Sequence, residues 1–198
     1  MSVEFQFDFE RTLAAVTYLA SKKEVTELTK YKICKLLFLA DKYHLVRYGR
    51  IITGDKYCAV PHGPIPSRTL NLLNAVISEN TFDQEAVTMS RVLELDRRYS
   101  NPRFSAVDVA APDQLSISDV EALDKAIAEY GKMGFGELKR ITHDAPAYIQ
   151  AWDARPSGSN GNDMEFEAFF DEEDADSVVG AYDVMIEDDL LRNSFPAR

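Results

Sequence analysis

Histidine and cysteine are the residue types in this chain best suited to metal binding or nucleophilic catalysis. His44 falls in a long apolar segment, His62 in a proline-rich turn and His143 near the end of a helical pattern. No His-x-x-x-His or His-Glu-x-x-His spacing occurs, although that spacing would place two zinc ligands on one helix face. Cys34 and Cys58 have no Cys-x-x-Cys neighbour, and a structural zinc site needs about four ligands. We therefore expect structural roles for these side chains, with His143 facing the negative end of its helix.

Motifs of nucleophilic enzymes and of phosphate-binding proteins are also missing from the sequence. There is no Gly-x-Ser-x-Gly turn, no P-loop and no dinucleotide-binding glycine pattern. Gly131, Gly134 and Gly136 follow a helical pattern instead of a strand, which is the wrong context for a phosphate-binding loop. We therefore do not expect an enzyme, a cofactor or a bound metal ion.

Carboxylates dominate the C-terminal part of the chain. Residues 156–191 contain twelve acidic residues and no Lys or Arg, whereas residues 1–155 have a formal charge of −1. This composition is typical of a solvated acidic face, but it also fits a docking surface for a basic partner. Calcium binding is less favoured, because the EF-hand spacing is absent. The densest acidic run is Asp171, Glu172, Glu173 and Asp174.

The total charge argues against binding to long nucleic acids. The chain has a formal charge of −11 and a pI of about 4.7, whereas such binding needs a positive surface that replaces phosphate counterions. One basic and aromatic cluster could stack bases, pair with the acidic C-terminal region or contact a protein partner, and stacking is the least favoured of these. Its members are Arg91, Arg97, Arg98, Tyr99, Arg103 and Phe104.

Length and composition indicate one globular, cytoplasmic domain. The 198 residues, of which 45% are hydrophobic, are enough to bury a substantial core. The N-terminus carries acids and no early basic run, so it does not look like a secretory signal. The longest apolar run, Leu36–Ala40, is too short to span a membrane. We distinguish residues 1–155 from an acidic C-terminal extension, residues 156–198, which we expect to pack on the same domain.

Hydrophobic periodicity predicts a mainly α (α+β) fold built around one long helix. Thr29 suits the N-cap of this helix and Gly49 its left-handed C-cap, and the apolar surface between them is wider than one stripe. A helix of this kind is buried on most sides, so we place it at the centre. Further helices are expected over residues 9–21, from Ser67 onward, from Ser118 (in a capping box with Glu121) to Tyr130, and over residues 135–143, 145–152 and 175–191.

Two short antiparallel hairpins complete the predicted fold. Arg50–Val60 has β-forming residues on both sides of Thr-Gly-Asp at 53–55, which indicates a hairpin turn. Pro61–Pro66 contains three prolines and is expected to be a stiff, irregular connector. Strand-like residues at 92–95 and 104–107 predict a second hairpin, which could extend the sheet of the first.

Several short motifs follow one another at defined spacings between residues 29 and 73. The chain reads Lys-Leu-Leu-Phe-Leu-Ala-Asp over 35–41, Tyr-Gly at 48–49, Thr-Gly-Asp-x-Tyr over 53–57 and His-Gly-Pro-Ile-Pro over 62–66. A weaker echo, Glu-Leu-x-x-x-Thr-His, follows over 137–143. In these motifs the chain resembles the Panacea domain, a SocA-like family of antitoxins and phage-associated proteins, over about residues 8–155. The main departure is His62, where the family usually has Tyr.

The resemblance implies a compact, mostly helical domain that acts as an antitoxin. It implies direct binding to a protein toxin encoded beside it, so that the active site or substrate entry of the toxin is covered. One branch of the family consists of adaptors that deliver their toxin to an ATP-dependent protease, and this is the alternative function. Because the chain begins directly at the domain, the DNA-binding module of some family members is not expected. A further alternative is a phage-borne nucleic-acid mimic that inhibits a defence enzyme. It would explain the acidic surface but not the Panacea motifs.

The motif residues are expected to be structural first, with a polar subset on exposed edges contacting the partner. Many toxins act on nucleotides or RNA and have a basic cleft, which an acidic face would approach quickly. The expected structural set is Lys35, Leu36, Leu37, Gly49, Gly54, Gly63, Pro64, Pro66 and His143. The expected partner-binding set is Asp41, His44, Asp55, Tyr57 and His62, together with Asp171, Glu172, Glu173 and Asp174.

Overall fold

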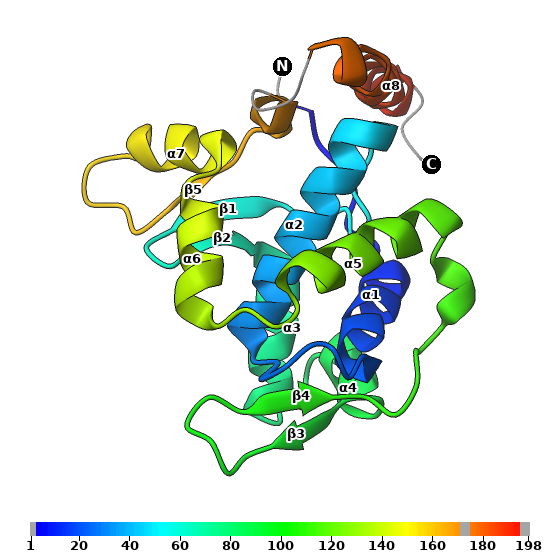
Figure 1. Ribbon diagram of the computed structural model, residues 1–198, viewed down its shortest axis with the longest axis vertical. Coiled ribbons are helices and arrows are strands. Elements are labelled where there is room, and N and C mark those ends of the chain that lie inside the picture. The colour runs from blue at the N-terminus through cyan, green and yellow to red at the C-terminus, as the bar shows by residue number, and fades with distance from the viewer. Residues whose placement is uncertain (1–2, 171–174, 195–198) are drawn as a thin grey trace.

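The fold is arranged around helix α2 (Lys30–Tyr48), which runs through the middle of the molecule (Figure 1). The structure is a computed structural model that describes residues 3–170 and 175–194. The expected mainly α fold with a small antiparallel β element is confirmed. The other α-helices are α1 (Phe9–Ser21), α3 (Ser67–Ile77), α4 (Gln84–Ser90), α5 (Ile117–Tyr130), α6 (Phe135–His143), α7 (Pro146–Asp153) and α8 (Ala175–Ser194).

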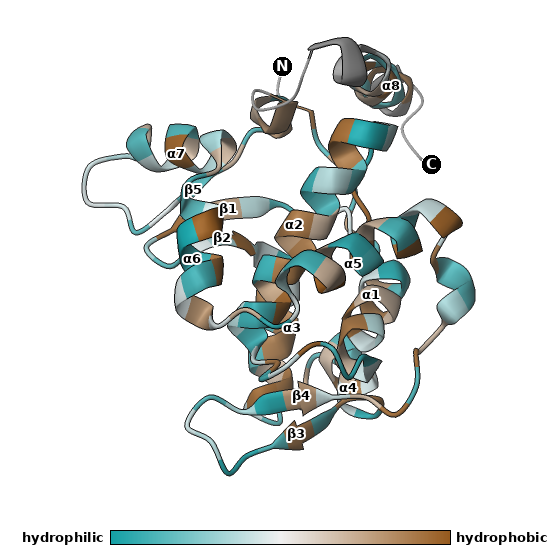
Figure 2. Cartoon of the chain, in the orientation of Figure 1, coloured by the Kyte–Doolittle hydropathy of each residue, from teal (hydrophilic) through white to brown (hydrophobic). Residues whose placement is uncertain are grey.

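Both predicted ends of α2 are confirmed. Thr29 Oγ1 accepts a hydrogen bond from the backbone N–H of Lys32, and Gly49 ends the helix with a φ of +73°. Elements α1, α3, α5, α6 and α8 all pack against α2, so its central residues are buried on most sides. Figure 2 accordingly shows brown, hydrophobic stretches along the middle of this helix. Because neighbours surround α2, side chains from different turns of this helix can contact several separate elements of the fold.

The first sheet differs from the predicted hairpin. Its strands are β1 (Tyr57–Val60), β2 (Gly63–Pro66) and β5 (Asn162–Asp163), in the order β2-β1-β5, with both pairs antiparallel. The hairpin predicted within residues 50–60 and the irregular connector predicted over residues 61–66 are therefore wrong. β2 tolerates two prolines because it is an edge strand, where a missing N–H donor breaks no ladder bond on the open side.

The second hairpin is confirmed, but it does not extend the first sheet. Strands β3 (Glu94–Asp96) and β4 (Arg103–Ser105) form a separate two-stranded sheet. The backbone N–H of Phe104 donates to the Leu28 carbonyl (2.7 Å), which ties β4 to the segment before α2. The hairpin therefore lies at the start of α2, below that helix in Figure 1.

Two predicted helix caps are wrong because other side chains occupy the capping positions. In α5, the capping box consists of Ser116 and Asp119, two residues before the predicted pair of Ser118 and Glu121. In α3, Ser67 is the first helical residue, and no side chain of the preceding residue caps the helix. The carboxylate of Asp55, which is distant in sequence, accepts the N–H groups of that first turn instead.

Two hydrophobic clusters share α2. One cluster joins α1, α2, α3 and α5, and the other joins α2, β1, α7, a 3₁₀ turn (Phe166–Phe170) and α8. The ring of Phe169 lies 5.5 Å from that of Phe38 on α2, and Met185 of α8 is fully buried. The part of the chain after residue 156 that the structure describes is therefore packed on the rest. The acidic residues Asp171, Glu172, Glu173 and Asp174 lie outside the described residues.

Candidate functional site

A buried carboxylate, Asp41, holds the Thr-Gly-Asp-x-Tyr loop against α2. Its Oδ1 accepts the backbone N–H of Ile52 (2.7 Å), and its Oδ2 accepts the hydroxyls of Thr53 (2.7 Å) and Tyr57 (2.8 Å). A longer bond comes from the N–H of Thr53. Burial raises the pKa of Asp41 and these donors lower it, and the net result is a pKa of about 6. The carboxyl group is therefore mostly ionised at neutral pH.

A second buried carboxylate, Asp55, connects the same loop to α3. It accepts the N–H groups of Arg68 (3.0 Å) and Thr69 (2.7 Å) and the Thr69 hydroxyl (2.7 Å). Gly54 beside it has a φ of +66°, and a Cβ there would lie 1.9 Å from the carbonyl oxygen of Gln6. The loop is therefore joined to α2, α3 and the N-terminal segment at once.

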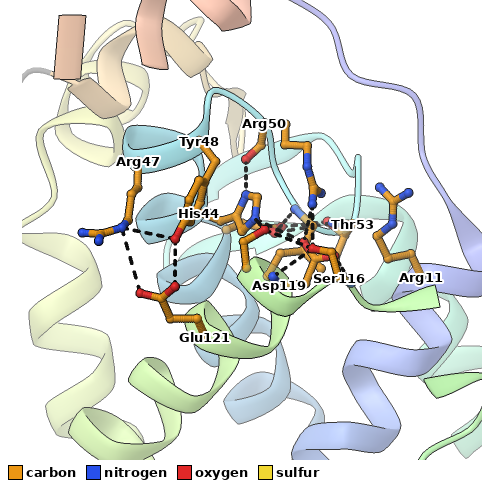
Figure 3. Close-up of polar contacts among 12 residues, drawn as sticks. Arg11, His44, Arg47, Tyr48, Arg50, Thr53, Ser116, Asp119 and Glu121 are labelled. Carbon is orange, nitrogen blue, oxygen red and sulfur yellow. Dashed lines mark hydrogen bonds and ion pairs between the residues drawn. The ribbon is translucent and has the colours of Figure 1, made fainter. Parts of the chain in front are cut away.

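His44 makes a third buried contact, between the end of α2 and the start of α5 (Figure 3). Its Nδ1 donates to the Arg50 carbonyl (2.8 Å), and its Nε2 lies 2.9 Å from Ser118 Oγ and 3.2 Å from Asp119 Oδ1. Asp119 also pairs with the Arg50 guanidinium at 2.9 Å. Burial lowers the pKa of His44, so the ring is neutral and its Nε2 accepts a hydrogen bond from the Ser118 hydroxyl. The histidine joins two helices and a loop.

These contacts correct the expected exposure of the partner-binding residues. Asp41, His44, Asp55 and Tyr57 are all buried, because each one satisfies loop or helix-end groups that α2 and α3 would otherwise leave without partners. Their direct contact with a partner stays a prediction, and their observed contacts are all internal. Among the members of this set that the structure describes, His62 alone is exposed as expected.

The expected structural residues converge beneath the His62 turn. The buried amine of Lys35 donates to the Pro64 carbonyl (2.7 Å), and burial lowers its pKa to about 7. Gly63 has a φ of +92°, and a Cβ there would lie 2.6 Å from Lys35 Nζ and 2.9 Å from His143 Cδ2. Nε2 of His143 is buried and has no hydrogen-bond partner among the described residues. The three motifs that contain these residues therefore meet at one place.

The remaining expected structural residues lie in the core or at close backbone contacts. Leu36 and Leu37 are fully buried, and Pro66 is buried in β2. Gly49 faces α8, since a Cβ there would lie 2.5 Å from the Ala181 carbonyl oxygen. That contact explains why a glycine suits this position beyond its role in ending α2.

Three aromatic rings form a patch around the turn, which we call the aromatic patch: Tyr31, His62 and Phe135. His62 and Phe135 are exposed, and Tyr31 is half-buried. The His62 ring lies 6.5 Å from Tyr31 and 6.1 Å from Phe135, and the last two are also 6.1 Å apart. Sequence reasoning missed Tyr31 and Phe135, because three distant segments supply the patch. One sequence signal could have found them. Both are aromatic residues in the first turn of a helix and outside its apolar stripe, which indicates a ring that is not needed for the core.

The basic cluster around the second hairpin is paired locally. Arg97 pairs with Glu79 (3.0 Å), Arg98 with Asp96 (2.6 Å) and Arg103 with Glu27 (2.5 Å). These partners all precede residue 156, so among the described residues the three arginines pair with nearby acids and not with the acidic C-terminal region. In the described ranges, no group of three or more His, Cys, Asp or Glu side chains could hold a metal ion. No helix of those ranges is long and apolar enough to cross a membrane.

Comparison with known proteins agrees with the motifs. The family model described as "Antitoxin SocA-like, Panacea domain" matches residues 33–149, which is more than half of the chain. Comparisons with curated proteins and with solved structures find no match. The matched range includes Lys35, Asp41, the Thr-Gly-Asp-x-Tyr loop, the His62 turn and His143. The chain therefore belongs to the SocA-like antitoxin family, and residues 33–149 are its Panacea domain.

Proposed function

We propose that this chain is an antitoxin that binds a toxin encoded beside it and covers the active site or substrate entry of that toxin. The family match over residues 33–149 carries the proposal. The site geometry supports it. The buried contacts of Asp41, Asp55 and Lys35 hold loops in place, while two rings of the aromatic patch, His62 and Phe135, stay exposed. Aromatic side chains on rigid supports are typical of protein-binding surfaces. On this proposal the chain is not an enzyme.

The acidic C-terminal region would speed the encounter with a toxin that has a basic cleft. Asp183 and Glu187 are exposed on α8, and the run at 171–174 adds four acids to the same part of the sequence. Opposite charges on two proteins raise the association rate more than they raise the final affinity, and salt screens this effect. A nucleotide- or RNA-acting toxin would provide such a cleft.

The steering role is tested by neutralising the quartet Asp171→Asn, Glu172→Gln, Glu173→Gln and Asp174→Asn. We expect a slower association rate with the toxin, a weaker dependence of that rate on salt and little change in dissociation. The control neutralises four exposed acids outside the region, Glu10, Glu24, Glu94 and Asp113, with the same change in net charge. Equal rates in both variants and the wild type would refute the steering role.

The main test is co-expression of the chain with the protein encoded next to it, followed by growth and co-purification. Rescued growth together with a stable complex and an unchanged toxin level would support occlusion. Rescued growth with disappearance of the toxin, and its return in cells that lack the ATP-dependent protease, would favour the adaptor function. If the neighbouring protein is not toxic and forms no complex, the proposal fails for that partner.

A further inference from the structure

A cavity of about 230 Å³ opens next to the aromatic patch. Its walls come from the start of α2, the start of α6 and the turn between β3 and β4, which lie on the same side of the molecule in Figure 1. Phe135 belongs to both the patch and the cavity, so the two surfaces are continuous. The residues that matter for its chemistry are Lys32, Arg103, Glu27, Tyr99 and Phe135.

A buried cation lines this cavity. Lys32 is only 5% exposed, and its Nζ donates to the carbonyl oxygens of Thr26 (2.6 Å) and Met133 (2.9 Å). An ammonium group has three N–H donors, and no group in the described residues accepts the third. Burial lowers the pKa of Lys32, and the nearby carboxylate of Glu27 offsets only part of this shift.

The acid of the cavity, Glu27, attracts the Lys32 amine but forms its ion pair with another residue. Glu27 is paired with the guanidinium of Arg103 at 2.5 Å, so these two charges offset one another. The charged residues that line the cavity are Lys32, Arg103 and Glu27, so the lining has one more basic than acidic residue. The whole chain, by contrast, has a formal charge of −11.

Two exposed rings border the cavity. Tyr99 is 43% exposed and Phe135 is 46% exposed, and the Arg103 guanidinium lies 3.7 Å from the centre of the Tyr99 ring. Aromatic rings and arginine are the residue types that contribute most to protein interfaces, because they offer large contact areas with few rotatable bonds. The rings are therefore suited to pack against residues on either side of a group that enters the cavity.

We infer that this cavity receives an aspartate or glutamate side chain from an acidic segment of the toxin, with its carboxylate accepting the third N–H of Lys32. Tyr99 and Phe135 pack against the residues that flank this acid, and the aromatic patch extends the contact. The inference rests on the proposed function and adds the contact surface and the chemistry of the segment that is recognised. It also gives the antitoxin two surfaces of opposite charge, one at this cavity and one in the acidic C-terminal region.

A protein segment fits these observations better than a nucleic acid does. Binding to a nucleic-acid strand neutralises many phosphates along a positive groove. Here one cation is buried and a second is already paired with Glu27, on a chain whose overall charge is −11. A single recessed amine matches one carboxylate, whose side chain can enter the cavity while its backbone remains outside.

The test measures the affinity of the full-length chain for the protein encoded beside it. Lys32→Met removes the charge but keeps most of the side-chain volume, and Lys125→Met on α5 is the control with the same change in net charge. We expect Lys32→Met to weaken binding by about tenfold or more and Lys125→Met by less than about twofold. Since Lys32 also bonds two backbone carbonyls, thermal unfolding of each variant is measured alongside.

The double variant Tyr99→Ala and Phe135→Ala tests the same surface without touching a buried side chain. We expect it to weaken binding by about tenfold and to leave the unfolding temperature nearly unchanged. A zero-length carbodiimide crosslinker should also join an acidic residue of the toxin to the Lys32 amine in the wild-type complex. If Lys32→Met and the double variant both bind like the wild type, the cavity is not the contact surface although the antitoxin function stands.

The remaining outcomes separate the two proposals. If the wild-type chain does not bind the neighbouring protein at all, the proposed function fails and this inference fails with it. A fluorescently labelled single-stranded oligouridine RNA is tested in parallel, and no binding is expected at physiological salt. If the wild type binds this RNA and Lys32→Met does not, the cavity recognises a nucleic acid and the inference is overturned.

Discussion

Two buried ionisable side chains on α2, those of Asp41 and Lys35, hold two loops of the Panacea domain in different ways. Asp41 accepts hydrogen bonds from three residues of its loop, and its two oxygens are fully used. Lys35 donates one bond to the His62 turn, and the neighbouring His143 has a buried nitrogen without a partner in the described part of the chain. A fully satisfied polar network fixes one conformation, whereas an incompletely satisfied one does so less firmly. We infer that Asp41 holds its loop in one conformation, whereas the His62 turn, which Lys35 supports, has more conformational freedom.

The largest effect is expected from Asp41→Ala. The variant leaves the Ile52 N–H and the Thr53 and Tyr57 hydroxyls buried without their acceptor, so we expect a loss of about 3–5 kcal/mol in the free energy of unfolding. Urea unfolding measures this loss. Tyr57→Phe removes a single donor and should cost about 1 kcal/mol. If Asp41→Ala cost no more than Tyr57→Phe, Asp41 would not be the centre of the network.

Gly63→Ala should have the next largest effect. An alanine at a φ of +92° is strained, and its Cβ would lie within 3 Å of Lys35 Nζ and His143 Cδ2. We expect a loss of about 2–3 kcal/mol in the free energy of unfolding. Gly158→Ala is the matched control, because Gly158 has a φ of +80° with no atom within 4 Å of the added carbon. Its cost should be about 1 kcal/mol, from strain alone. Equal costs would show that the space beneath the His62 turn is not tightly filled.

The pH dependence of stability tests the buried state of Lys35. Burial holds the pKa of Lys35 at about 7 in the folded chain, compared with 10.5 for a free side chain. The unfolded chain therefore binds more protons between these values, and folding becomes more favourable as the pH rises through that window. Relative to Lys35→Met, the wild type should gain about 2 kcal/mol of stability between about pH 7 and about pH 9.

This comparison needs urea unfolding of both proteins at both pH values, with Lys125→Met as the exposed control. The difference between the wild type and Lys125→Met should be the same at both pH values, since Lys125 is charged throughout. If the wild type and Lys35→Met changed in parallel, the Lys35 amine would be charged in the folded state. A charged Lys35 amine would then need a second hydrogen-bond acceptor in the folded chain besides the Pro64 carbonyl.

The backbone of the fold could largely be predicted from local sequence signals. Thr29 and Gly49 mark the ends of α2 because capping depends on the residue at that position and on its neighbours. The β2 strand could not be found in this way, since two prolines favour an irregular segment unless an edge position is known. Likewise, Asp55 caps α3 across more than ten residues, and only the tertiary fold brings the two together.

The site was harder to predict because burial, not residue type, decides the roles of its members. Polar residues are usually exposed, which is why Asp41, His44 and Asp55 were expected at the surface. The same reasoning treats Lys32 as one cation among many, whereas the structure encloses it beside a cavity. Family motifs mark positions that matter, but they do not distinguish a residue that holds a loop from one that meets a partner.

The smallest effect on stability, and the sharpest contrast with Asp41, is expected at His62. The His62 ring is exposed and meets Tyr31 and Phe135 edge-on, so His62→Ala should cost about 0.5 kcal/mol or less. On the proposed function, the same variant should weaken binding to the neighbouring toxin by about fivefold or more, because a ring is lost from the contact surface. His62→Tyr restores the residue type usual in the family and should bind at least as well as the wild type. Isothermal titration with the purified toxin and thermal unfolding give both quantities. If His62→Ala instead destabilised the protein as much as Asp41→Ala, the His62 turn would be as essential to the fold as the Asp41 loop. The distinction between the two buried ionisable side chains of α2 would then not hold.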